Sequence, residues 1–231
     1  MGISQAGKLI LQALKASWDH FTTLIVLNLA WFFLWLLPMF INSITSDNLV
    51  WFLICVAASL FLLGPVTAAI QHLINQIIRH DELSVSEFIQ AFKKYFWRSQ
   101  GLVLIGIVTI LLIVVNFTIT SGSASFIMRV ITGMWLYLAL FWLLVAQFVF
   151  PFLVQYDLGV WTIIKRSAML VVDNLLVSLI LLLVCGLLTF ISLFLVIPFV
   201  ILWFTVISLM QNLIMVELLE KYSNGHSKEV E

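Results

Sequence analysis

Charged residues are scarce in this sequence, and their scarcity decides the class of protein. Only 10% of its 231 residues are Asp, Glu, Lys or Arg, whereas about a quarter of the residues in an ordinary soluble domain are charged. Hydrophobic residues make up 63%, and no charged residue stands between positions 175 and 216. So few charges cannot cover the surface of a water-soluble fold of this size, and the excess apolar surface therefore needs lipid as its solvent.

Cysteine and the motifs of catalysis are also scarce or absent. The two cysteines, Cys55 and Cys185, both lie inside apolar runs, where cysteine acts as a small packing residue rather than as a disulfide or metal pair. Metal binding by His72 is disfavoured, because His80 is eight residues away and no Cys or carboxylate stands at ligand spacing from His72. No phosphate-binding loop, dinucleotide fingerprint, zinc-peptidase helix or serine elbow is present. The sequence therefore predicts a protein that is not an enzyme and holds no metal or cofactor.

The net charge and the positions of the charged residues limit the kinds of partner and function that we expect. Lys and Arg together number 11, as do Asp and Glu, so the net charge is zero and nothing in it attracts nucleic acid. No Asp or Glu lies well inside an apolar run, although proton-coupled and sodium-coupled transporters usually place ionisable groups or broken helices at mid-membrane. These absences count against an autonomous secondary transporter.

Six apolar runs are present, and each is long enough to cross a bilayer as a helix. We expect spans at about residues 21–41, 49–78, 101–119, 126–155, 175–194 and 198–216, and surface helices at about 5–18, 84–98 and 158–172. The predicted fold is an all-α membrane protein with six transmembrane helices as three hairpins, each preceded by a cytoplasmic amphipathic helix. Residues 1–222 would form one membrane domain, and residues 223–231 a disordered tail.

The basic residues predict the orientation of these spans. With six spans, ten of the eleven Lys and Arg residues fall on one side, and only Arg129 falls on the other. Basic residues concentrate on the cytoplasmic side of membrane proteins, so both termini are expected there. A five-span alternative would export Lys221 and Lys228 and leave a split of eight against three, which fits the rule less well.

The second span carries a group of polar residues at helical spacing. Pro65 removes one backbone hydrogen bond, so a kink is expected there. Thr67, Gln71 and Asn75 recur every four residues and make a polar stripe on one helix face, with His72 beside it. The stripe fits two interpretations, namely hydrogen bonds between helices near the cytoplasmic interface or a polar pocket for a headgroup or a sugar.

The middle surface helix is the best defined of the three. Ser84 and Glu87 fit a capping box, in which each side chain meets a free N–H group of the first turn. Phe92 belongs to an apolar face, whereas Lys93 and Lys94 lie away from it. The helix either lies on lipid headgroups or offers a docking surface to a cytoplasmic partner or another subunit.

Three segments carry a resemblance to a known family. They are Leu63-Gly64-Pro65-Val66-Thr67-Ala68-Ala69, then Phe88 with Ala91-Phe92-Lys93-Lys94 and Trp97-Arg98, and finally Phe150-Pro151 followed by Gln155-Tyr156-Asp157-Leu158. Over about residues 13–219 the chain resembles the YesL-like family of bacterial membrane proteins, which is defined as a domain of unknown function. The resemblance implies a location in the bacterial cytoplasmic membrane and a link to carbohydrate uptake and breakdown. It assigns no catalytic or binding residue.

Two classes of function are therefore expected. The first is a non-enzymatic accessory protein of carbohydrate uptake or utilisation, which contacts the lipid bilayer and subunits of a membrane transporter or sensor, or a second copy of itself. The second is a small transporter or flippase-like protein with a polar cavity between its spans. The candidate structural or interaction residues are Gly64, Pro65, Thr67, Gln71, His72, Asn75, Phe92, Lys93, Lys94, Trp97, Arg98 and Pro151.

Overall fold

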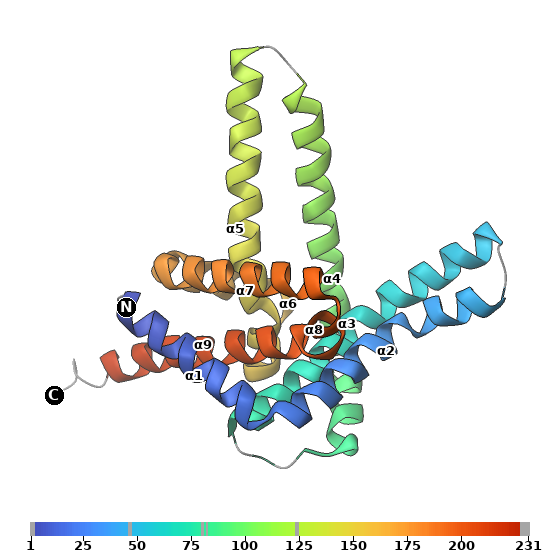
Figure 1. The fold of residues 1–231 in the computed structure, drawn as a ribbon. Helices are drawn as coiled ribbons and strands as arrows, with labels where there is room; N and C mark the ends of the chain where they lie inside the picture. The colour runs from blue at the N-terminus through green and yellow to red at the C-terminus, as the bar shows by residue number, and fades with distance from the viewer. Residues whose placement is uncertain (1–2, 46–47, 80, 82, 123–124, 227–231) are drawn as a thin grey trace.

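The described part of the chain is entirely helical (Figure 1). The computed structural model describes residues 3–45, 48–79, 81, 83–122 and 125–226. The helices are α1 (Ile3–Asp19), α2 (Phe21–Thr45), α3 (Leu49–Arg79), α4 (Val85–Ser121), α5 (Phe126–Tyr156), α6 (Val160–Asp173), α7 (Leu175–Leu195), α8 (Ile197–Ile201) and α9 (Trp203–His226).

Six helices are long and apolar enough to cross a membrane. They are α2, α3, α4, α5, α7 and the stretch Trp203–Glu220 of α9. Each has at least 18 residues, and its mean hydropathy is high enough for a span. Each predicted apolar run falls on one of these helices, the last on α8 and α9 together. The chain therefore has the helices of a multi-pass membrane protein.

The structure differs from the sequence prediction in two places. The sequence predicts a surface helix at 84–98 apart from a span at 101–119, but α4 runs unbroken through both. Gly101 does not end the helix, because one glycine costs only about 1 kcal/mol in a helix interior and the adjacent turn is packed, with Ser99 fully buried. The predicted disordered tail starts at residue 223, but α9 continues to His226 because the good helix formers of residues 217–221 carry it on. Residues 227–231 lie outside the described part.

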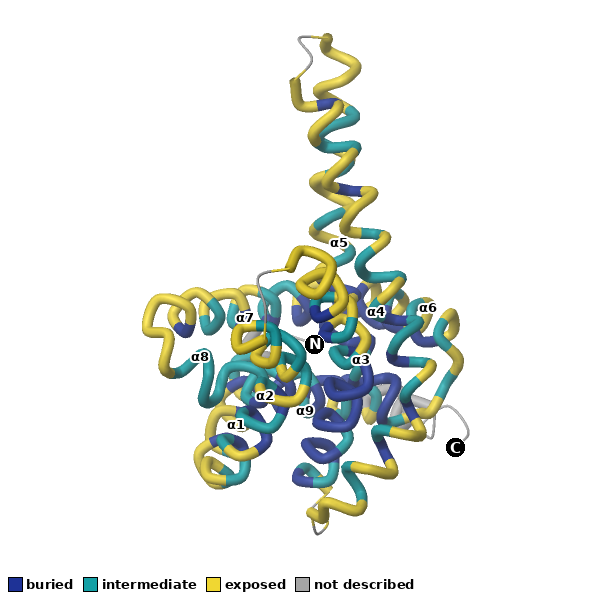
Figure 2. The backbone as a smooth tube through the Cα atoms, turned by 90° about the vertical axis from the view of Figure 1, so that its right-hand side faces the viewer, coloured by how far each residue is buried: buried dark blue, intermediate teal, exposed yellow. Residues whose placement is uncertain are grey.

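Buried residues gather where the helices converge, in a region that we call the hub. It comprises residues 64–77 of α3, 91–102 of α4, 144–154 of α5 and 205–218 of α9, with α1 and α6 packed against them. The other halves of these spans, with much of α2 and α7, form arms whose large apolar side chains are exposed (Figure 2). The core therefore lies at one end of the spans, and the arms need lipid or a partner to cover them.

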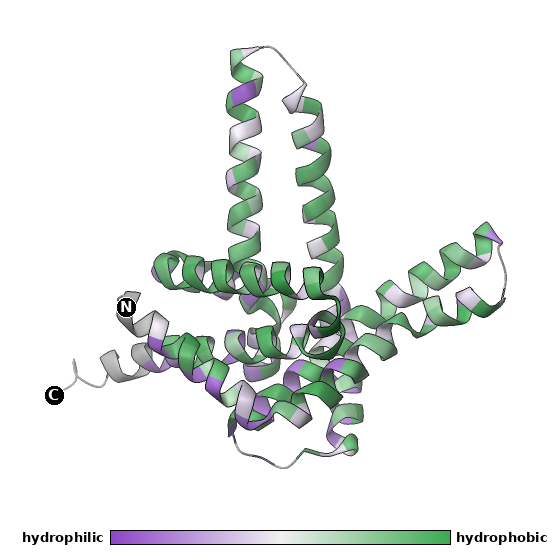
Figure 3. Cartoon of the chain, viewed as in Figure 1, coloured by the Kyte–Doolittle hydropathy of each residue, from purple (hydrophilic) through white to green (hydrophobic). Residues whose placement is uncertain are grey.

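The arms point in different directions. In Figure 1 the α4–α5 hairpin stands apart from the α2–α3 hairpin, and α7 lies across the direction of α5. Figure 2, turned by 90°, shows the same crossing of α7 and α5. Hydrophobic residues dominate all three arms, whereas hydrophilic residues are frequent around the hub (Figure 3). Side chains that could form a polar site are therefore concentrated at the hub.

The predicted turn between the last two spans falls at Val196. This residue takes a φ of 57°, which is uncommon for a β-branched side chain. The short helix α8 follows, and Asn28 of α2 then holds its junction with α9. Asn28 is fully buried; its Nδ2 donates to the Val200 carbonyl at 2.6 Å, and its Oδ1 accepts from the backbone N–H groups of Phe204 and Thr205 at 2.9 and 3.2 Å. Because the first N–H groups of a helix lack partners within it, Asn28 caps α9 from a neighbouring helix.

Replacing Asn28 with alanine should destabilise the protein. The change leaves one carbonyl and two N–H groups without their partner, and a buried polar group without a partner costs about 1–3 kcal/mol. Thermal unfolding in detergent, followed by circular dichroism, measures the loss. Asn116→Ala is the matched control, because Asn116 is only partly buried and its side chain donates to the Leu112 carbonyl of its own helix. Equal melting temperatures for the two variants would contradict the capping role.

Candidate functional site

The helices α3 and α4 approach each other closely at Gly64. A Cβ atom built on Gly64 would lie 2.6 Å from Oε1 of Gln100 and 3.0 Å from the backbone C and O atoms of Ser99. At 3.0 Å the backbone contacts would be tighter than nearly all real Cβ contacts, so α4 would have to shift by a few tenths of an ångström to admit a larger residue. Ser99 is fully buried at this point. Gly64 is therefore the residue that lets the two helices pack backbone to backbone.

The next residue, Pro65, creates a defect that α4 repairs. Proline has no backbone N–H, so in a helix it leaves the carbonyl four residues earlier without its usual donor. That carbonyl belongs to Phe61, and the side-chain Nε2 of Gln100 donates to it at 2.6 Å. The ring of Phe61 also packs edge to face on Phe96 of α4, with 5.2 Å between the ring centroids. The Gly64–Pro65 pair thus joins α3 to one particular turn of α4.

The polar stripe of α3 points at other helices. Thr67 accepts a hydrogen bond from Nε1 of Trp31 at 3.0 Å. Gln71 donates to Oγ of Ser208 at 2.9 Å and accepts from Nδ2 of Asn212. Oδ1 of Asn212 in turn accepts from Nε2 of Gln155 at 3.0 Å. The stripe and its partners therefore link α3 to α2, α9 and α5 inside the hub, as interhelical hydrogen bonds do in other membrane proteins.

His72 and Asn75 lie next to these bonded residues. Asn75 is only 4% exposed, and its Oδ1 has no hydrogen-bond partner among the described residues. The His72 ring is half-buried 5.8 Å from the ring of Tyr95, and its Nδ1 likewise has no partner in the described part. No group of three His, Cys, Asp or Glu side chains within the described ranges is placed to hold a metal ion.

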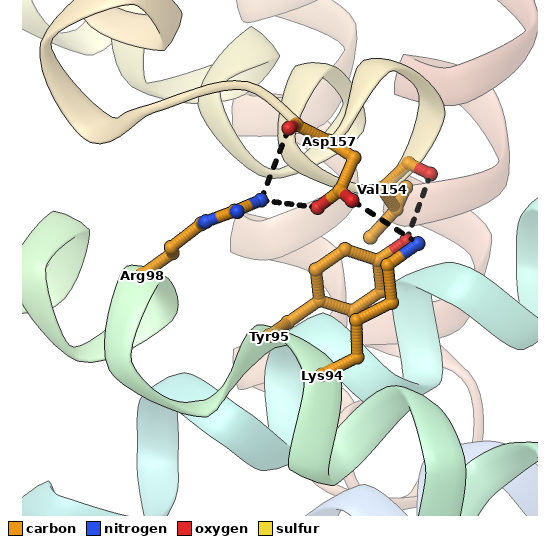
Figure 4. Close-up of polar contacts among 5 residues, drawn as sticks. All are labelled: Lys94, Tyr95, Arg98, Val154 and Asp157. Carbon is orange, nitrogen blue, oxygen red and sulfur yellow. Dashed lines mark hydrogen bonds and ion pairs between the residues drawn. The ribbon is translucent and has the colours of Figure 1, made fainter.

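Asp157 fastens α4 to the end of α5 (Figure 4). It follows the last residue of α5 in the left-handed conformation, at φ 50° and ψ 42°. Arg98 donates to its carboxylate and, at 3.0 Å, to its backbone carbonyl, while Nζ of Lys94 lies 3.4 Å from the other carboxylate oxygen. Tyr95, between the two cations, donates to the Val154 carbonyl at 3.3 Å. One carboxylate thus holds two basic residues that are one turn apart.

The predicted docking residues of α4 therefore fall into two groups. Lys94 and Arg98 are engaged with Asp157, and Phe92 packs partly buried against the hub. Lys93 and Trp97 point away, and Trp97 is 77% exposed. We call Ile89, Lys93 and Trp97 the outward face of α4; they are exposed and follow one another at four-residue spacing.

Pro151, the remaining candidate, lies buried in the hub part of α5. The sequence prediction missed Gln100, Asn212 and Asp157. The sequence contained an indication for Asp157, because it is the only carboxylate near the end of the fourth predicted span. Lys94 and Arg98, four residues apart on one helix, are two basic residues that such a carboxylate could pair with. For Gln100 and Asn212 no sequence signal identifies which helix they meet.

Residues 24–117 match the model of a family described as "Protein of unknown function, DUF624". The match spans nearly all of α2, the whole of α3 and most of α4, so it contains the Gly64–Pro65 crossing and the outward face. No curated protein and no solved structure matches the chain. The matched family is without an assigned function, so functional inference rests on the geometry.

The repair of Pro65 by Gln100 predicts a specific coupling between the two residues. Gln100→Ala should lower the free energy of unfolding by about 1 kcal/mol, as for other hydrogen bonds in membrane proteins, because the Phe61 carbonyl then loses its donor. In a Pro65→Ala background the new backbone N–H satisfies that carbonyl, so Gln100→Ala should cost clearly less. A double-mutant cycle by denaturant unfolding in detergent measures this difference.

Gln147→Ala serves as the control for this cycle. Gln147 donates to the Ser178 carbonyl at 3.1 Å, a carbonyl unrelated to any proline, so its effect should simply add to that of Pro65→Ala. If Gln100→Ala is as costly with alanine at position 65 as with proline, the proposed repair is wrong.

Proposed function

We propose that this chain is a non-enzymatic accessory protein of the bacterial cytoplasmic membrane that binds a subunit of a membrane transporter or sensor through the outward face of α4. The proposal rests on one observation: this face is exposed, although the helix that bears it is attached to its neighbours at two other places. The Gly64–Pro65 crossing and Asp157 hold α4 on two sides. Lys93 and Trp97 are left outside both attachments. The resemblance to the YesL-like family supports a role in carbohydrate uptake as part of this proposal.

The composition of the outward face favours binding of a protein. Tryptophan is enriched among the few residues that contribute most of the binding energy of protein interfaces. The ring of Trp97 packs edge to face with that of Phe96, with 5.3 Å between the ring centroids. A face on a rigid helix also loses little conformational freedom on binding. Lipid headgroups are the competing contact, because tryptophan and lysine also gather at membrane interfaces.

Charges and exposure support three hairpins that each follow an amphipathic helix. Ile10 and Ala13 of α1 are buried against the hub, whereas Leu11 and Trp18 are 67% and 76% exposed beside the exposed Lys15. Such a mixture of apolar and basic side chains on one outer surface suits the membrane interface. The N-terminal part of α4 and the helix α6 hold the corresponding places before the other two helix pairs.

The distribution of polar groups disfavours the alternative of a small transporter or flippase. Several polar side chains of the hub, among them Gln71 and Asn212, bond one another. Between residues 101 and 156, which include both helices of the α4–α5 arm, Arg129 is the only charged residue. A transport path needs polar or ionisable groups at mid-membrane. The cavity of about 260 Å³ that holds Arg166 and Asp173 lies between the ends of α5, α6 and α9, not along an arm.

The proposed topology predicts which positions a membrane-impermeant thiol reagent reaches. The native cysteines Cys55 and Cys185 are first replaced by serine. Single cysteines at Ser43, Ser123 and Leu195 should then label from outside intact cells, whereas those at Ser84 and Ser227 should label only after the membrane is opened. Leu195 is the most informative position, because α7 lies across α5 (Figure 1). Labelling of Leu195 only from the inside would place the third pair along the membrane instead of across it.

The docking role predicts a protein contact at the outward face. A photoreactive amino acid in place of Trp97 should cross-link to a second protein in native membranes. Lys93→Glu should lower that yield about tenfold, which corresponds to about 1.4 kcal/mol. Lys8→Glu is the control, since Lys8 is equally exposed but lies on α1. If position 97 yields lipid adducts alone, the outward face is a lipid contact and the docking role is wrong.

A further inference from the structure

An apolar groove of about 520 Å³ runs between α2, α3 and the beginning of α4. Leu27 of α2, Leu73 of α3 and Phe88 of α4 line its wall. Val26 at its rim is 61% exposed, so the groove opens to the surroundings of the arms. Since the spans of this chain have lipid as their solvent, lipid is what the open side of the groove meets.

The groove is polar at one end and apolar at the other. Thr22 and Thr23 lie at the start of α2, and Ser84 lies at the start of α4 on the same side of the molecule, whereas Leu34 lines the far end. From Thr22 to Leu34 the helix rises about 18 Å, over twelve steps of 1.5 Å per residue. One leaflet contributes about half of the roughly 30 Å hydrocarbon core. The groove therefore matches one leaflet in both length and polarity.

We propose that this groove binds one acyl chain of a phospholipid from the leaflet at the N-terminal end of α2, with the phosphodiester group at the hydroxyls of Thr22 and Thr23. These hydroxyls are donors, and phosphodiester oxygens are acceptors that every phospholipid carries. An acyl chain needs no hydrogen bonds, which suits walls made of leucine and phenylalanine. A bound peptide would bring backbone N–H and C=O groups that such walls cannot satisfy.

Water is a poor occupant for the same reason. The part of the groove lined by Leu and Phe offers water no polar partners, whereas a buried water needs two to four of them. Left empty, the groove would deprive its lining of packing contacts on one side. A seated acyl chain restores these contacts and also joins α2 to the turn of α4 that precedes the outward face. The proposal does not depend on the docking role of that face.

The test counts phospholipid bound to the full-length protein. The protein is stripped of lipid in a mild detergent, incubated with dioleoylphosphatidylglycerol, and analysed by native mass spectrometry. We expect one strongly retained phospholipid per chain. Ala30→Phe fills the groove and should reduce retention at least tenfold, whereas Ala139→Phe, a matched change on the arm of α5, should leave it unchanged.

A second variant keeps the test decisive if Ala30→Phe fails to fold. Val26→Trp alters only the exposed rim of the groove, so it should fold and still lose the lipid. Retention by Ala30→Phe or Val26→Trp equal to that of the parent would overturn the proposal. So would a parent that retains no lipid, or one that retains a second copy of the chain in its place.

Discussion

The hub depends on the crossing of α3 and α4 at Gly64 and Pro65. Glycine removes the side chain that would keep the helices apart, and proline frees the Phe61 carbonyl that Gln100 then binds. Either residue alone would weaken a helix. Together they allow α3 to contact the turn of α4 that contains Ser99 and Gln100. Because α4 is placed there, Lys94 and Arg98 reach Asp157, and Lys93 and Trp97 are turned outward.

The hub and the arms are stabilised in different ways. In the hub, polar side chains of α2, α3, α5 and α9 bond one another, and apolar residues pack around them. In the arms nearly all large side chains are apolar (Figure 3), and many of them are exposed. Lipid solvates such surfaces without any specific partner, whereas the hub needs each of its residues in place. Function is therefore expected at the hub and on the surfaces next to it.

The sequence predicted the elements well and their contacts poorly. Long apolar runs locate the spans because the bilayer sets their length. Ser84 caps α4 by accepting from the N–H of Glu87 at 3.2 Å, which is half of the predicted capping box, since Oε2 of Glu87 has no partner among the described residues. Lys94 was predicted to face outward, yet it pairs with Asp157, 63 positions later in the chain. The partner of Gln100 was equally unpredictable from the sequence. Helical periodicity shows on which face of its helix a residue lies, but not which other helix packs against that face. The direction of the arms had no sequence signal at all.

The most direct test of this account is the carbonyl ¹³C chemical shift of Phe61, measured by NMR on selectively labelled protein in detergent. A hydrogen bond to a carbonyl deshields its carbon. Gln100→Ala should therefore move the Phe61 signal upfield in the parent and leave it in place when residue 65 is alanine, because the restored backbone N–H then serves as the donor. A Phe61 signal that does not respond to Gln100→Ala in the parent would contradict the crossing on which the hub depends.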